Sequence, residues 1–161
     1  IYEKDFLTEM YPLNKYYFDI NICKKIFQVK KLEKKPKRLV FFTEPRRQQV
    51  NFYIIKNLLK ISGLDLFIKI HPLEKKQNYR YFKTIKFIDD FDDAISNNIC
   101  LSRKSTILIE AVYNNSNALA VLVDDQDKYD FENTFVSLMD PNISKFYSFT
   151  DLVVKIKKLK N

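Results

Sequence analysis

Two short polar motifs in this chain carry the side chains needed to hold a phosphate group. The only histidine of the 161 residues, His71, precedes Pro72 at the end of the apolar run 64–70. Ser105 and Thr106 stand together before a second apolar stretch. An imidazole and two hydroxyls can all donate hydrogen bonds to phosphate oxygens, and an imidazole can also offset charge on a leaving phosphate. We therefore predict an anion site in which His71 is the candidate catalytic residue.

The elements that must position these motifs alternate between strands and helices from residue 38 onward. Continuous apolar runs predict strands over residues 39–42, 64–70, 84–88, 99–101 and 118–123. Apolar spacing predicts helices over residues 50–61, after 89–93, and over 106–113 and 152–159. The helix at 106–113 is apolar on all sides and is expected to be buried. Such alternation is typical of an α/β fold with a Rossmann-like parallel sheet and helices on both faces.

The loops that follow the strands are expected to lie on one rim, because crossovers between parallel strands are right-handed. Ligands of open α/β sheets bind at this rim. The chain has one glycine, Gly63, which fits a left-handed turn after the first helix, so a glycine-rich phosphate loop cannot form. The side chains expected at the rim are Glu44, His71, Asp89, Asp90, Ser105, Thr106 and Asp124.

Each candidate also has a purely structural interpretation. The ring of His71 can be a partly buried group that the backbone satisfies. Ser105 or Thr106 can cap the following helix, although a capped helix N-terminus also attracts anions. Asp89 and Asp90 can form a turn and begin a helix, or one of them can accept hydrogen bonds from the two hydroxyls of a ribose. The sequence leaves both interpretations open.

Charged residues around the motifs are weaker candidates. Ser102, Arg103 and Lys104 can add polar or positive groups to the mouth of the site, or they can be solvated. The acidic run 124–132 lacks the glycine and the ligand spacing of an EF-hand loop, so a solvated loop is expected there. No metal site is predicted.

Composition excludes several classes of protein. The net charge is +8, but the abundance of Lys, Asn, Ile, Phe and Tyr indicates an AT-rich coding sequence that inflates lysine. Basic residues form no compact motif with aromatic residues, so no nucleic-acid partner is expected. No apolar run approaches the roughly 18 residues that span a bilayer. Cys23 and Cys100 have no metal or redox spacing and indicate a reduced, cytoplasmic setting.

The order of the motifs resembles the C-terminal domain of bacterial sialyltransferases with two Rossmann-like domains, the GT-B architecture. The resemblance is to the lipooligosaccharide sialyltransferases and polysialyltransferases. It rests on a strand followed by Lys69-Ile70-His71-Pro72, a carboxylate after the next strand, and a strand leading to Ser105-Thr106 and a helix. It covers residues 38–161, which is most of the chain.

The resemblance implies a glycosyltransferase that moves sialic acid from CMP-sialic acid to a cell-surface glycan such as lipooligosaccharide or capsule. It implies that His71 contacts the donor phosphate and assists the departure of CMP, and that Ser105 and Thr106 bind this phosphate. Asp89 or Asp90 would hold the ribose. Such enzymes need no metal or other cofactor. With Glu44 and Pro72 at strand ends, the candidate donor-binding residues are Glu44, Pro72, Asp89, Asp90, Ser105 and Thr106.

The chain departs from this family in one respect. The family carries Asp/Glu-Asp/Glu-Gly in its N-terminal domain, which supplies the base for the acceptor hydroxyl, and no such triplet occurs here. In residues 1–37 the apolar spacing predicts a helix at 20–29, followed by a charged stretch from residue 30, and the segment is too short to be that domain. We expect residues 1–37 to be a helical or linker remnant of a preceding domain and residues 38–161 to be the nucleotide-sugar-binding domain, inactive on its own.

Two alternatives share these features. One is a transferase with another nucleotide-linked donor, CDP-glycerol or a UDP-sugar. The other is a non-catalytic nucleotide-binding module in which His71 is structural. Expected partners are the nucleotide sugar, a glycan or glycolipid acceptor, the missing N-terminal domain and a second copy in a homodimer. The lysines at 155–160 either form a solvated face or weakly attract anionic lipid, which would place the protein on the inner face of the inner membrane.

Overall fold

The computed structural model describes residues 36, 38–61, 65–124, 127 and 135–160. The helix expected at 20–29, the charged stretch before residue 36 and the turn at Gly63 lie outside these described residues. So does most of the acidic run after Asp124.

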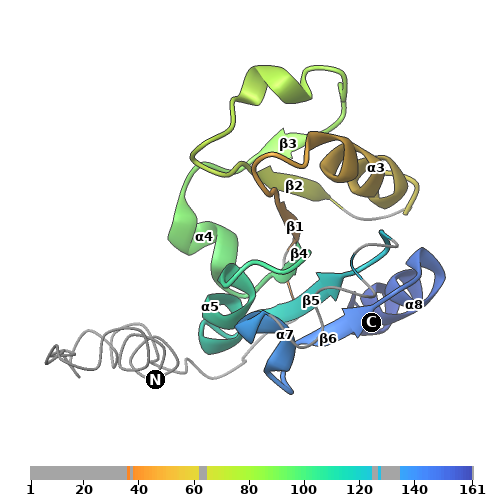
Figure 1. Ribbon diagram of the computed structural model, residues 1–161. Helices are drawn as coiled ribbons and strands as arrows, with labels where there is room; N and C mark the ends of the chain where they lie inside the picture. The colour runs from red at the N-terminus through yellow and green to blue at the C-terminus, as the bar shows by residue number, and fades with distance from the viewer. Residues whose placement is uncertain (1–35, 37, 62–64, 125–126, 128–134, 161) are drawn as a thin grey trace, which may run out of the picture.

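A parallel sheet forms the centre of the domain (Figure 1). The described residues contain six strands in the order β3-β2-β1-β4-β5-β6, and every neighbouring pair is parallel. The strands are β1 (Leu39–Phe42), β2 (Leu66–Lys69), β3 (Lys86–Phe87), β4 (Ile99–Ser102), β5 (Asn117–Val121) and β6 (Ser144–Phe146). This is the strand order of a doubly wound Rossmann-like sheet, so the predicted fold class is confirmed.

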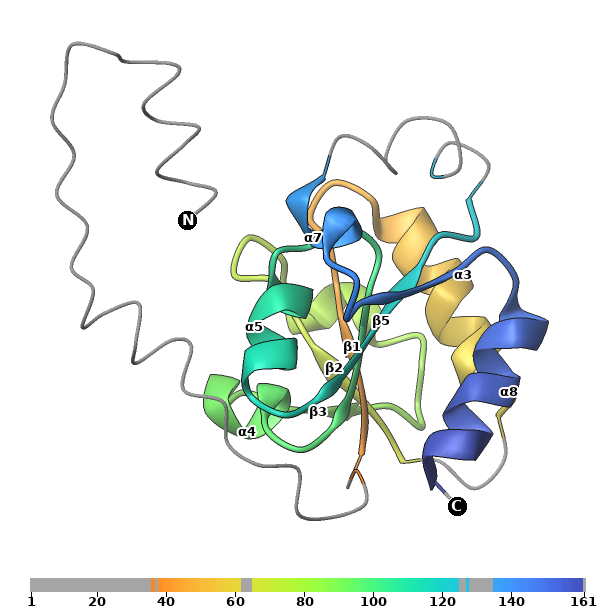
Figure 2. The same ribbon diagram turned by 90° about the horizontal axis from the view of Figure 1, so that it is seen from below.

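Helices cover both faces of the sheet, as predicted. Figure 2 shows α3 and α8 on one face and α4, α5 and α7 on the other. The helices are α3 (Gln48–Leu58), α4 (Phe91–Ile95), α5 (Ile107–Tyr113), α7 (Val136–Met139) and α8 (Phe149–Lys160), and a 3-10 turn, η1 (Lys76–Tyr79), precedes β3. Three elements, η1, α7 and β6, were not predicted, because each is short and carries polar residues.

Two apolar clusters hold the layers together, one on each face. Side chains of β1 alternate between them: Leu39 and Phe41 pack against α3 and α8, and Val40 and Phe42 pack against α4 and α5. Burial on both faces explains why the central strands read as continuous apolar runs. Cys100 on β4 is fully buried, as expected, and burial raises the pKa of its thiol to about 12.

The helix α5 differs from the expectation of full burial. Leu108 and Ala111 are buried against the sheet, but Ile107, Ile109 and Val112 are half-buried. A seven-residue helix on the surface of one layer presents only one side to the core. Its apolar composition therefore overstated its burial.

The strand order reverses between β1 and β4. From β1 the chain passes outward through α3 to β2 and β3, then crosses back through α4 to β4 and continues to β5 and β6. Loops that follow adjacent strands at such a point diverge to opposite faces and leave a crevice at the carboxyl ends. The loops after β1 and β4 therefore flank the expected ligand position. Within the described residues, no helix has both the length and the apolar character needed to cross a membrane.

Candidate functional site

The carboxyl rim carries the predicted motifs on neighbouring strands. His71 follows β2, Glu44 follows β1, and Ser105 follows β4, so Glu44 lies between the two motifs. Asp89 follows β3, at the edge of the sheet. Adjacent strands lie roughly 4.8 Å apart, which separates the ends of β2 and β4 by roughly 10 Å and those of β3 and β4 by roughly 14 Å.

His71 begins a four-residue turn. The backbone N–H of Glu74 donates to the carbonyl of His71 at 2.8 Å, and exposed Pro72 occupies the second position, where its restricted φ suits a turn. The N–H of Leu73 donates to Nδ1 of the imidazole at 3.1 Å. A neutral ring that accepts at Nδ1 carries its proton on Nε2. Within the described residues no hydrogen bond engages Nε2, and the side chain is half-buried, so this N–H is available to an acceptor.

A buried polar cluster lies beneath this turn. The N–H of His71 donates to Oγ1 of Thr43 at 2.9 Å, and the Thr43 hydroxyl donates to Glu74 at 2.5 Å. The Tyr79 hydroxyl donates to the other oxygen of Glu74 at 2.8 Å and accepts from Asn51 on α3 at 3.0 Å. Burial and the adjacent Glu74 raise the pKa of Tyr79, which therefore stays a proton donor. The loops after β1 and β2 thus meet α3 and η1 at these bonds.

A buried ion cluster lies at the carboxyl ends of β1 and β4. Arg103, the first residue after β4, is fully buried and pairs with Asp127 through Nε and Nη2 and with Glu44 through Nη1 at 3.2 Å. The other oxygen of Glu44 accepts the N–H of Lys104 at 3.0 Å. Glu44 thereby holds the loop that leads to Ser105. The cluster joins the loops after β1, β4 and β5.

This cluster corrects two expectations. Arg103 is not solvated, because its planar fork satisfies two carboxylates inside the protein. Asp127 is not part of a solvated loop, since it is fully buried against Arg103. The sequence contained one signal for this, a charged residue directly after a buried strand, on the rim expected to bind ligands. The identity of its partners, however, depends on chain segments far away.

The hydroxyls after β4 have different surroundings. Ser102 is buried and donates to the carbonyl of Phe42 at 3.2 Å, so it joins β4 to β1 rather than lining the mouth. Oγ of half-buried Ser105 accepts the N–H of Ile107 at 3.4 Å, which supports the capping interpretation for this residue. Thr106 is exposed and its side chain makes no capping bond to the described helix α5.

The two aspartates after β3 also differ. Asp90 caps α4 by accepting the N–H of Asp93 at 2.6 Å, as one interpretation predicted. Asp89 is exposed and forms an ion pair of 2.6 Å with Lys76, whose hydrogen bond holds the pKa of Asp89 below its usual value. Lys69 also donates to the backbone carbonyl of Asp89. These bonds tie the edge strand to the loop that carries His71.

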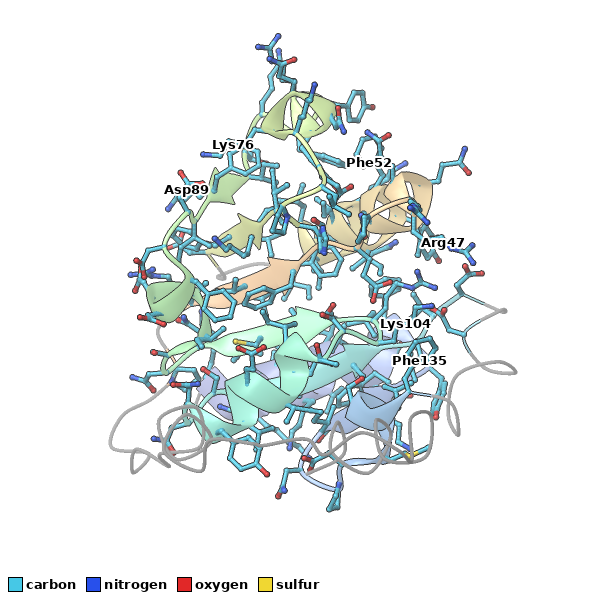
Figure 3. All side chains as sticks on the ribbon, turned by 60° about the vertical axis from the view of Figure 1, so that its left-hand side comes forward. Arg47, Phe52, Lys76, Asp89, Lys104 and Phe135 are labelled. Carbon is cyan, nitrogen blue, oxygen red and sulfur yellow. The ribbon has the colours of Figure 1, made fainter. Side chains whose placement is uncertain are left out.

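Positive side chains collect at the other end of the rim. The ammonium group of Lys104 lies 4.3 Å from the ring centre of Phe135, and burial lowers the pKa of Lys104. Arg47 lies on the same side, whereas Asp89 and Lys76 lie on the opposite side (Figure 3). Arg46, beside Arg47, has a φ of 66°, a backbone conformation that is uncommon outside glycine and asparagine. The loops after β1 and β4 therefore carry the cationic side chains Arg46, Arg47 and Lys104 as well as the carboxylate of Glu44.

Glu110 on α5 is partly buried, and the effect of this burial on stability can be tested. Burial raises the pKa of Glu110 above its ordinary value of 4.5. The native state then binds the proton more tightly than the unfolded state, so this group lowers stability as the pH rises from about 4.5 through the native pKa. Glu110→Gln is expected to raise the free energy of unfolding at pH 7 by a few tenths of a kcal/mol. Urea unfolding should give the two proteins equal free energies of unfolding at about pH 3.5, where Glu110 is protonated. A difference as large at pH 3.5 as at pH 7 would show that the charge of Glu110 is not its cause.

Within the described residues, no three side chains of His, Cys, Asp or Glu gather as a metal site would require. Comparisons with protein-family models, with curated proteins and with solved structures find no match to this chain.

Proposed function

We propose that this chain is the donor-binding domain of a glycosyltransferase that uses CMP-sialic acid and acts on a cell-surface glycan. One observation carries the proposal: the loop bearing Ser105-Thr106 follows β4, beside the point at which a Rossmann-like sheet reverses its strand order, and the loop bearing His71 follows β2, the other neighbour of β1. Nucleotides bind to such sheets at this point. The ends of β2 and β4, from which the two loops start, lie roughly 10 Å apart, which leaves room for a phosphate to contact both loops.

In this proposal Nε2–H of His71 donates to an oxygen of the donor phosphate, and the hydroxyls of Ser105 and Thr106 donate to the same group. When the bond from the anomeric carbon to the phosphate oxygen breaks, CMP leaves with the electron pair, and the His71 hydrogen bond stabilises the added charge. The acceptor hydroxyl forms the new bond and loses its proton to a base supplied by another domain. Of the two aspartates, Asp89 is the ribose partner in this proposal, because Asp90 holds the backbone of α4 in its cap, whereas the ion pair of Asp89 with Lys76 is exposed and can exchange for a ribose.

Titration of the chain with CMP, CDP and UDP by calorimetry tests the proposal. We expect CMP to bind with a dissociation constant in the micromolar to millimolar range, roughly −4 to −8 kcal/mol, and more tightly than UDP. Preference for CDP or UDP would instead favour a transferase with CDP-glycerol or a UDP-sugar as donor. Absence of binding to any cytidine nucleotide, in a sample shown to be folded by circular dichroism, would rule out both cytidine-dependent proposals.

A further inference from the structure

We infer that Thr43 and Glu74 are positioning residues for His71. The turn 71–74 has the imidazole at its first residue and the carboxylate of Glu74 at its last. A single hydroxyl joins the two ends: Oγ1 of Thr43 accepts the N–H of His71 at 2.9 Å and donates to Oε2 of Glu74 at 2.5 Å. A hydroxyl has one proton and two lone pairs, so it can make both bonds at once.

The residues around these two hydrogen bonds of Thr43 hold them in place. Thr43 is 4% exposed and follows β1 directly, where its own N–H continues the ladder by donating to the carbonyl of Lys69 at 3.1 Å. Oε1 of Glu74 accepts from fully buried Tyr79 at 2.8 Å. Asn51 donates to Tyr79 at 3.0 Å and to the carbonyl of Glu44 at 2.8 Å. A buried network in which each member is satisfied fixes one geometry.

The geometry that it fixes is the one that presents Nε2–H. Nδ1 of the imidazole accepts the hydrogen bond from the N–H of Leu73 only while the turn keeps its shape. If Thr43 loses its hydroxyl, His71 loses an acceptor for its N–H and Glu74 loses a donor, and the turn is released at both ends. The ring then no longer has a fixed tautomer. The consequence for phosphate binding rests on the proposed function, whereas the effect on the imidazole does not.

The chain offers a direct probe, because His71 is its only histidine. Long-range proton–nitrogen spectra of an untagged, nitrogen-15-labelled chain at pH 8 report the tautomer of this one ring. We expect the Nε2–H form in the unsubstituted chain. Thr43→Val, which matches the shape of threonine without the hydroxyl, should give averaged nitrogen shifts of a tautomer mixture, and exchange of the His71 amide should be at least tenfold faster. Thr43→Ser, which keeps the hydroxyl, should restore both signatures.

Thr84→Val is the matched control, since Thr84 is exposed and precedes β3. Nitrogen shifts and amide exchange in Thr43→Val that equal those of Thr84→Val would overturn the inference. If Thr43→Val does not fold, Glu74→Gln decides, because Thr43 and Tyr79 donate to different oxygens of Glu74 and glutamine replaces one of these oxygens with an NH2 group that cannot accept. An unchanged ring tautomer in Glu74→Gln would overturn the inference equally. A changed tautomer in a chain that binds none of CMP, CDP and UDP would uphold the positioning role while the proposed function fails.

Discussion

Replacing Arg103 by methionine is expected to lower the free energy of unfolding by about 3–5 kcal/mol. Arg103 and Asp127 are both fully buried, and Glu44 is 8% exposed. Methionine fills a similar volume but leaves two carboxylates inside the protein without the guanidinium that balances them. In the native state, attraction to a guanidinium then no longer offsets the cost of removing those two charges from water.

Urea unfolding of Arg103→Met, Asp127→Asn, their double variant and two comparison variants measures this effect. Arg103→Lys keeps the charge but loses the planar fork, so it should recover only part of the loss. Arg80→Met removes an exposed arginine after η1 and should change the free energy of unfolding by less than about 0.5 kcal/mol. In the double variant Arg103→Met/Asp127→Asn, the losses should be clearly less than additive, because the second change removes a charge that the first left unpaired. Additive losses would show that the two residues do not act as a pair.

Replacing His71 by alanine is expected to weaken CMP binding by about 10- to 100-fold. A hydrogen bond to a charged acceptor contributes about 1.5–3 kcal/mol, and each 1.4 kcal/mol is a factor of ten in affinity. The double variant Ser105→Ala/Thr106→Ala, which removes two hydroxyls from the other side of the crevice, should lose affinity to a similar extent. Both effects act on the complex, because Nε2 of His71 and the exposed Thr106 hydroxyl lie at the rim rather than in the core.

Calorimetry gives the affinities, and urea unfolding of the same samples separates binding from folding. Lys157→Ala on α8, away from the rim, is the control and should leave CMP affinity unchanged. If His71→Ala lowers stability while its CMP affinity equals that of the control, the histidine is structural. The chain would then be a nucleotide-binding module rather than the donor half of an enzyme.

The sequence was sufficient to predict those features that depend on one short segment of the chain. Residues 39–42 are apolar at every position, and the structure places them as β1, buried on both faces. The cap formed by Asp90 also depends only on neighbours, since it binds the N–H of Asp93. In contrast, β6 spans three residues, two of them Ser144 and Lys145, and exists because β5 offers it an edge to pair with. Pairing of this kind leaves little trace in a short polar segment.

The sequence by itself therefore determined the class of fold and the rim on which its candidate residues lie, because the alternation of apolar strands and helices depends on nearby residues and the placement of the loops depends on the handedness of crossovers. Only the tertiary structure decided what holds those residues in place. Arg103 is buried because Glu44, 59 positions away, and Asp127, 24 positions away, meet it at the switch point. Thr43 meets Glu74 across 31 positions. Whether a charged side chain faces water or a partner is set by contacts between distant segments, and residue type alone does not specify them.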